Sequence, residues 1–234
     1  WSTTSLGPIE SWPQSLRSAV SILLPSKAQI VLFWGPELVA IYNDAYRPVF
    51  GPKHPVALGR PAGQSWSEVW DVLEPLFQSV VTTGEAFWAK DHLFELERHG
   101  YLEETYFDVS YDPVRDESGR VGGLFCIVSE TTGRIIGERR LAALRDLGRI
   151  GSGASSTREV FRNAAAVLVR YQRDIPFAAI YGWDAAGGPA QLQATSGVTP
   201  GERAAPERND ISNRTESWPI GGESEMVLSE PSAA

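Results

Sequence analysis

Two strand-like segments that run directly into a charged helical segment constrain the fold of this chain most strongly. The strand-like segments are residues 104–111 and 121–129, and both are rich in aromatic and β-branched side chains. The polar, glycine-bearing segment 115–120 separates them, so the pattern predicts an antiparallel hairpin. A helical pattern opens at Glu130 and continues to about Ile150. A sheet that ends in such a helix suggests that a change in the sheet is passed along the chain.

Composition and charge narrow the class of protein. The chain has 234 residues, of which 42% are hydrophobic, enough for one large domain or two small ones. Its net charge of −8 argues against nucleic acid as a partner, because phosphate binding needs a basic face. No stretch approaches the ~20 apolar residues that cross a bilayer, so no membrane span is expected in this fragment.

The single cysteine and the first residue bear on location and processing. One cysteine excludes an internal disulfide framework and fits a reducing compartment. The chain begins at Trp1 and shows no basic-then-apolar leader, which favours a piece trimmed from a longer protein. We expect a cytoplasmic protein.

The first 97 residues supply three further strands and the helices around them. The predicted elements are a helix that begins at Pro13 and stops near Pro25, strands at 30–34 and 38–42, short helical turns and loops over 43–65, a helix from Ser67 to Gly84 with a kink at Pro75, and a strand from Phe87 to about Glu97. Two blocks of strands with helices gathered between them predict an α+β fold. We expect a five-stranded antiparallel sheet with helices on one face.

The C-terminal part predicts a second, smaller domain. Glycine and serine between residues 148 and 153 indicate a domain boundary, and Ser156 with Glu159 forms a candidate capping box for a following helix. Strands are predicted at 177–183 and 191–196, and residues 199–234 are polar with little periodicity. A helix, a hairpin and a polar tail make a poor core. Either this domain is cut short or its later strands lie outside the chain.

No set of residues in the sequence forms a catalytic constellation. His54, His92 and His99 are not spaced with Cys or His as metal ligands, and ordinary loop or surface histidines are favoured over a metal site. Cys126 lies among apolar neighbours, which favours a buried structural thiol over a reactive or chromophore-attached one. No phosphate-binding glycine loop and no nucleophile elbow appear. The chain is therefore not predicted to be an enzyme, and catalysis stays a remote alternative.

An aromatic and polar set around the expected cavity is the candidate ligand site. Small-molecule sites are mostly apolar with a few placed polar groups, and this set would suit one. The alternative is simply an aromatic-rich core. The candidate residues are Trp34, Tyr42, Asn43, Tyr46, Trp66, Trp70, Tyr106 and Phe125.

Several stretches together resemble a known family. Residues 1–133 resemble a PAS sensor domain of the kind found at the front of bacterial hybrid sensor histidine kinases and PP2C-type regulatory phosphatases. The stretches that carry the resemblance are Leu6-Gly-Pro-Ile-Glu-Ser-Trp-Pro-Gln-Ser-Leu16, Trp34-Gly-Pro-Glu-Leu38, Tyr42-Asn-Asp-Ala-Tyr46, Lys53-His-Pro55, Gly100-Tyr-Leu-Glu-Glu-Thr-Tyr106 and Gly122-Gly-Leu-Phe-Cys126. Glu130-Thr-Thr132 stands where PAS domains join their last strand to a signalling helix.

A second, partial resemblance covers the C-terminal part. Residues 154–234 resemble the first half of a GAF domain, through Ile175-Pro-Phe-Ala-Ala-Ile-Tyr181 and Trp218-Pro-Ile220. The resulting division is a PAS-like domain at 1–133, a signalling helix and linker at 134–153, and the N-terminal part of a GAF-like domain at 154–234. A GAF domain continues beyond this length, so its ligand pocket would be incomplete here.

The resemblance implies a sensory input module of a two-component or related signalling system. The implied mechanism is that a small ligand or partner shifts the sheet, and that the helix 134–150 relays the change to a kinase or phosphatase output domain elsewhere in the protein. The chain itself lacks a phospho-accepting histidine in a dimerisation helix and lacks ATP-binding glycine boxes. The implied relay residues are Glu130, Thr132 and Arg134. A homodimer is expected through the apolar stripe of the helix, formed by Ile136, Ala143, Leu144, Leu147 and Ile150.

The family's cofactors fit this sequence poorly. A flavin photosensor needs a reactive cysteine in the short helices, whereas Cys126 lies on a strand. A haem sensor usually places a histidine on the long helix, and residues 67–83 contain none. A bilin would want an attachment cysteine near the N-terminus or in the GAF-like part. We therefore predict no cofactor and leave open an unidentified small ligand, with a ligand-free docking and dimerisation module as the alternative.

Overall fold

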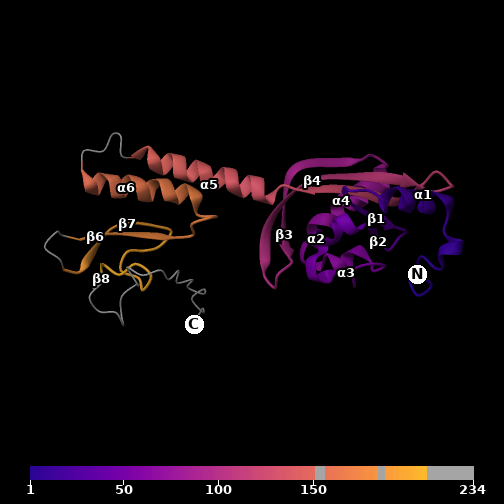
Figure 1. Ribbon diagram of the computed structural model, residues 1–234, viewed down its shortest axis with the longest axis horizontal. Helices are drawn as coiled ribbons and strands as arrows, with labels where there is room; N and C mark the ends of the chain where they lie inside the picture. Colours follow the sequence, from indigo (N-terminus) through magenta and orange to yellow (C-terminus); the bar gives the residue numbers. More distant parts are fainter. Residues whose placement is uncertain (151–155, 184–187, 210–234) are drawn as a thin grey trace. The chain divides into compact units, whose positions relative to one another are not determined.

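A computed structural model describes residues 1–150, 156–183 and 188–209 (Figure 1). The chain divides into two compact units, Trp1–Ile136 and Gly137–Ala234. The boundary lies within helix α5 (Thr132–Gly148), so the first turn of this helix belongs to the first unit and the remainder to the second.

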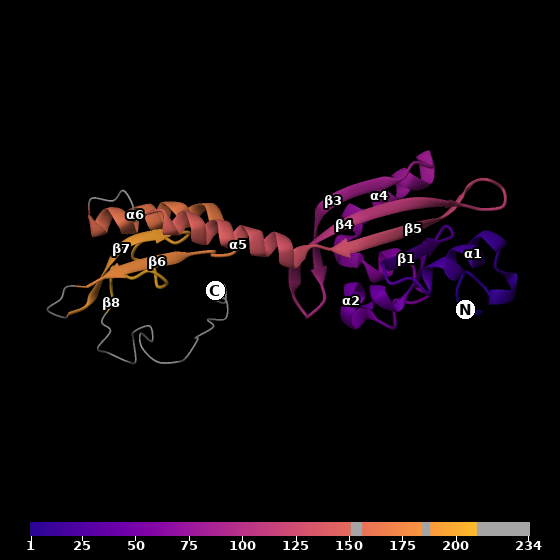
Figure 2. The ribbon, with the colours of Figure 1, turned by 45° about the horizontal axis from the view of Figure 1, so that its top comes forward.

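The first unit is built on a five-stranded antiparallel sheet with strand order β2-β1-β5-β4-β3. Figure 2 shows β4 between β3 and β5. The strands are β1 (Gln29–Trp34), β2 (Val39–Tyr42), β3 (Phe87–Glu97), β4 (Leu102–Arg115) and β5 (Val121–Glu130). The two sequence blocks meet where β1 pairs with β5, from Gln29 opposite Val128 to Trp34 opposite Gly123. The predicted five-stranded antiparallel sheet is confirmed, and with its helices the first unit is an α+β fold.

Alternation of side chains along β4 shows why this segment forms a strand. Thr105, Phe107, Val109 and Tyr111 are buried, whereas the residues between them are partly exposed. Successive residues of a strand point to opposite faces, so the buried set lines one face of the sheet. β1 departs from this pattern because both of its faces are covered, and its apolar run is continuous.

Most of the helices cover the sheet face that carries the buried residues of β4. They follow β2 in the chain: η2 (Asp44–Tyr46), α2 (Arg47–Phe50), η3 (Gly51–Lys53), α3 (Ala62–Ser65), η4 (Ser67–Val69) and α4 (Trp70–Thr83). α4 buries Leu73, Phe77 and Val80 against the sheet, and each such side chain contributes about 1.5–3 kcal/mol. Gly84 adopts the left-handed conformation (φ 68°) that ends the helix, as the sequence predicted.

Helix α1 (Gln14–Leu23) lies on the opposite face, so the prediction of helices on one face only is wrong. Its buried residues Leu16, Ala19 and Leu23 pack against Leu32 and Trp34, which alternate along β1 with residues of the main core. The short helix η1 (Ile9–Ser11) precedes it. The cause is the continuous apolar run of β1, which presents side chains to both faces and therefore needs a cover on each.

The second unit contains a three-stranded sheet of order β6-β7-β8 together with helices α5 and α6. Ser156 accepts a hydrogen bond from the Glu159 amide at 3.3 Å, which places the predicted cap at the start of α6. The remaining elements are α6 (Thr157–Leu168), η6 (Val169–Tyr171), β6 (Ala178–Gly182), β7 (Ala190–Ser196) and β8 (Arg208–Asn209). The predicted boundary residues 151–153 and the GAF-like segment 218–220 lie outside the described residues.

Candidate functional site

A small cavity of about 40 Å³ lies between the sheet of the first unit and the helices of its main face. Strands β1, β3, β4 and β5 contribute the floor, and η2, α2, η4 and α4 contribute the roof. The lining residues are Val31, Phe33, Tyr46, Val49, Trp66, Val69, Leu73, Phe77, Phe94, Leu96, Phe107, Val109, Tyr111, Cys126 and Val128. Its walls are therefore almost entirely apolar, as small-molecule sites commonly are.

Two of the eight predicted ligand residues, Tyr46 and Trp66, line this cavity. The ring of Trp66 stacks on Phe50 with centroids 4.7 Å apart, and Tyr46 contacts Phe50 edge-on. Tyr42 and Trp70 belong to the same core without lining the cavity; the Tyr42 hydroxyl is hydrogen-bonded to His54 Nδ1 at 2.9 Å.

Three other predicted ligand residues lie on the opposite face of the sheet. Trp34 and Phe125 pack with helix α1. Tyr106 alternates with the buried residues of β4, and its hydroxyl donates to Glu104 Oε1 at 2.6 Å. Whether any of the eight contacts a ligand stays a prediction. The cavity residues that the sequence reasoning missed, such as Phe107 and Val109, were accessible to it through the alternation of β4.

The eighth, Asn43, has a structural role at the end of β2. Its side-chain oxygen accepts from the amides of Ile30 and Tyr46. The two N–H groups of its Nδ2 are shared among three carbonyls, of Leu23, Ser26 and Ala28, at 2.8–3.2 Å. Asn43 is buried, and these bonds use its whole donor and acceptor capacity. It therefore joins α1, β1 and η2 and has no capacity left for a ligand.

Cys126 is buried, as predicted, and lies in the cavity lining. Burial raises the pKa of its thiol well above the ordinary value, and nearby Asp112 raises it further. A neutral thiol is a weak nucleophile, so this environment favours a structural role. Among the described residues, no three His, Cys, Asp or Glu side chains are grouped as metal ligands.

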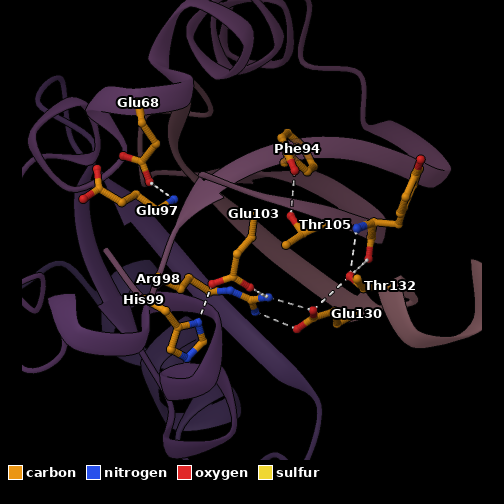
Figure 3. A network of polar contacts seen from close by, with 10 residues as sticks. Glu68, Phe94, Glu97, Arg98, His99, Glu103, Thr105, Glu130 and Thr132 are labelled. Carbon is orange, nitrogen blue, oxygen red and sulfur yellow. Dashed lines mark hydrogen bonds and ion pairs between the residues drawn. The ribbon is translucent and has the colours of Figure 1, made fainter. Parts of the chain in front are cut away.

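The joint between the sheet and α5 is held by a polar cluster that we call the joint cluster: Arg98, His99, Glu103, Glu130 and Thr132 (Figure 3). The Arg98 guanidinium donates to both carboxylate oxygens of Glu130 at 2.9 and 3.1 Å and to Glu103 Oε2 at 3.0 Å. The Arg98 side chain is only 10% exposed. Bidentate, charge-assisted bonds of this kind are stronger than neutral hydrogen bonds and fix the relative orientation of the two groups.

Glu103 shows how this cluster affects ionisation. Burial by itself would raise the pKa of Glu103, but the hydrogen bonds from His99 and Arg98 outweigh it and lower the pKa below the ordinary value. Glu103 therefore carries its charge at neutral pH. Since the cluster joins the β3–β4 turn to the last residue of β5, this charge helps to hold the end of β5 in place.

Thr132 connects the first turn of α5 to β4. Its Oγ1 accepts from the Tyr106 amide at 2.9 Å and donates to Glu130 Oε1 at 2.9 Å, and the Thr131 amide donates to the Tyr106 carbonyl at 2.7 Å. Arg134, the third predicted relay residue, pairs with Asp91 at a bulge of β3. This hydrogen bond is the largest cause of the lowered pKa of Asp91.

A run of contacts links the cavity lining to the joint cluster within the first unit. Lys53 Nζ lies 4.7 Å from the ring centroid of Trp66 and pairs with Glu68. Glu68 Oε1 accepts from the Glu97 amide at 3.4 Å, and the next residue is Arg98 (Figure 3). A Cβ at Gly51 would stand 3.4 Å from Arg98 Cβ, so the cover helices also pack directly on Arg98. The polar contacts of the cavity roof therefore end one residue before Arg98, and the backbone between Glu97 and Arg98 connects them to the joint cluster.

The predicted dimer stripe does not present a single free face. Ala143 is buried, and Ile136, Leu147 and Ile150 are partly buried. Within the second unit, α5 contacts η6 through Asp146, which accepts from the Tyr171 hydroxyl at 2.9 Å. Leu144 is 65% exposed, and so is its neighbour Leu141, at 67%, which the prediction did not include. Whether the stripe forms an interface stays a prediction.

Of the known proteins compared with this chain, only solved structures resemble it. No protein-family model and no curated protein matches the chain. The solved structures that resemble it include PAS and light-oxygen-voltage domains. An RNA-binding light-oxygen-voltage receptor is 21% identical with a TM-score of 0.42, over 62% of this chain and 42% of its own length. The PAS domain of Bordetella pertussis BvgS is 20% identical with a TM-score of 0.41, over 56% of this chain and 96% of its own. A light-oxygen-voltage protein of Rhodobacter sphaeroides is 14% identical with a TM-score of 0.42, over 68% and 97%.

This chain spans less than half of the RNA-binding receptor's length. None of the helices that the structure describes is both long and apolar enough to span a membrane.

Replacing Arg98 by Met should destabilise the first unit by about 2–3 kcal/mol. The substitution leaves the charges of Glu103 and Glu130 without their main partner, and breaking a fully buried pair costs about 3–5 kcal/mol. We expect less because the Glu130 side chain is 27% exposed. Chemical denaturation followed by circular dichroism gives the value. Arg47→Met, which removes an exposed pair with Asp44, is the matched control and should change stability by about 0.5 kcal/mol or less.

Proposed function

We propose that this chain is a sensory input module of a bacterial signalling protein. In this proposal, a small ligand or a partner changes the packing of the first unit, and α5 relays the change to an output domain of kinase or phosphatase type. The signal-sensing role is supported by the PAS-like fold of the first unit. The second unit would be a GAF-like domain, on the resemblance of its sequence.

The observation that carries the proposal is the polar network between the cavity and the helix. Trp66 forms part of the cavity wall, Lys53 lies over it, and Glu68 connects Lys53 to the end of β3. Arg98 then binds Glu130, the last residue of β5. A ligand that displaced Trp66 would disturb Lys53 and Glu68. The disturbance would reach Glu130 through the hydrogen bond from Glu97 to Glu68, the peptide link from Glu97 to Arg98 and the ion pair of Arg98 with Glu130. Coupling of this kind needs such physical continuity together with two alternative packings.

A double-mutant cycle between Lys53→Met and Arg98→Met tests the connection. If the network couples the cavity roof to the joint, the two losses of stability should be non-additive by about 0.5–1 kcal/mol, as for residues within one polar network. The measurement is the free energy of unfolding of the wild type, both single variants and the double variant. Lys27→Met, an exposed lysine with no contact to the network, combined with Arg98→Met is the control and should be additive. Additivity in both cycles would remove the support for the relay.

The proposed partner is a second copy of the chain, bound through α5. Leu141 and Leu144 are three residues apart and so lie on the same side of the helix, and both are exposed. Exposed leucines at this spacing are typical of two-helix contacts. Because Ala143 is already buried, we place the proposed contact on Leu141 and Leu144 and not on the centre of the predicted stripe.

Sedimentation velocity tests this contact. We expect the chain to be dimeric and the variant Leu141→Glu/Leu144→Glu to be monomeric, because two charges would face each other across an apolar contact. Val169→Glu/Phe177→Glu, which changes two exposed apolar residues elsewhere in the same unit, should stay dimeric. A leucine variant that remains dimeric would contradict the contact.

A second candidate function is a docking module that uses the outer face of the sheet. Trp88, which is 68% exposed, stands opposite Ser110, and Ser110 stands opposite Ile127, so Trp88 and Ile127 lie in one row on one face. Loss of the dimer in Trp88→Glu/Ile127→Glu, with retention in the leucine variant, would favour docking through this face.

A further inference from the structure

The cavity of the first unit is lined by two tyrosines whose hydroxyls have no hydrogen-bond partner among the described residues. Tyr46 and Tyr111 line the cavity and are only 5% and 4% exposed. Neither hydroxyl has a hydrogen-bond partner among the described residues, whereas the hydroxyl of the nearby Tyr42 is bonded to His54. Neither oxygen is among the fully buried polar atoms without a partner, so each keeps some accessible surface, and a small guest in the cavity could satisfy both hydroxyls.

The two hydroxyls belong to one small polar site. Tyr111 on β4 stands directly opposite Cys126 on β5, and Tyr46 comes from η2 in the cavity roof. The three groups are close enough that Tyr111 and Cys126 each raise the pKa of Tyr46, after the larger effect of burial. Both phenols therefore stay protonated at neutral pH and can each donate a hydrogen bond.

The rest of the lining limits what these donors can hold. The cavity wall contains no charged side chain, and a buried ion without a partner is strongly disfavoured. A water molecule occupies roughly 10–15 Å³ of such a volume, so 40 Å³ admits a guest of about three or four non-hydrogen atoms. Anything larger would have to move the roof formed by η2, η4 and α4.

We propose that this cavity binds a small neutral molecule whose hydrogen-bond acceptor, such as a carbonyl oxygen, is held by the hydroxyls of Tyr46 and Tyr111. The inference rests on the proposed sensory function and specifies its ligand class: neutral and compact, with an acceptor at one end and an apolar body against Phe77 and Phe107. Charged metabolites are excluded by the same lining. A guest near the size limit presses on Trp66, the roof residue that leads to the joint cluster.

Acetone and acetate form a matched pair of probes, since each has four non-hydrogen atoms and a similar shape while only acetate is charged. Titration of the whole chain, followed by NMR of the methyl groups of Val109 and Val128 in the lining, should show saturable shifts with acetone and none with acetate. Tyr46→Phe/Tyr111→Phe should weaken acetone binding at least ten-fold. Tyr42→Phe, which removes a hydroxyl outside the lining, should change it less than two-fold.

The same variants supply a readout that needs no ligand. Because the two hydroxyls are unpartnered, replacing both tyrosines by phenylalanine should leave the melting temperature unchanged or raise it, whereas Tyr42→Phe should lower it. A lower melting temperature in the double variant, equal shifts with acetone and acetate, or unaltered acetone binding by the double variant would each overturn the proposal. If acetone binds but the stability losses of Lys53→Met and Arg98→Met are additive, the proposed relay is wrong and the ligand site still stands. The two failures are therefore distinguishable.

Discussion

Arg98 carries its charge into a largely buried site, where its guanidinium reaches Glu130 through two hydrogen bonds and Glu103 through a third. Removing these charges from water costs free energy that is recovered only when the geometry is good and each partner is satisfied. These ion pairs therefore need not add much to the free energy of unfolding. Their clearer effect is to fix the orientation of Arg98 relative to Glu103 and Glu130. It fixes the end of β5 against the β3–β4 turn, and the first turn of α5 begins from that position.

Strand β4 of the sheet has two structural roles: one set of its residues lines the cavity, and the alternating set attaches α5. Along β4, Phe107, Val109 and Tyr111 face the cavity and the cover helices. Tyr106, which alternates with them, provides the backbone hydrogen bonds that hold Thr131 and Thr132. One strand thus contributes both to the wall of the cavity and to the attachment of the helix. A change in the packing of the cavity has a short path to α5, which is the physical basis of the proposed sensory role.

The strands and the long helices could be predicted from the sequence because periodicity reports the burial of each element directly. The alternation along β4 and the capping pair Ser156 and Glu159 are signals of this local kind. The sequence could not predict which face of the sheet α1 covers, because a continuous apolar run such as β1 is compatible with a helix on either face. The role of Arg98 was missed for a related reason: its partner Glu130 is 32 residues away, and no local pattern marks a long-range ion pair. The amide type of Asn43 suggests a ligand residue, but its side chain bonds only to backbone groups of the fold.

Native-state hydrogen exchange at the amides of Tyr106 and Thr131 tests most directly whether Arg98 holds the joint. These amides bond to Thr132 Oγ1 and to the Tyr106 carbonyl, so they report on the attachment of α5 to β4. In Arg98→Met, we expect exchange at both amides to be at least about ten-fold faster, equivalent to ~1.4 kcal/mol of local opening, with amides of the β1–β5 pair changed much less. Unchanged exchange at the two amides, or an equal increase throughout the first unit, would contradict this role of Arg98.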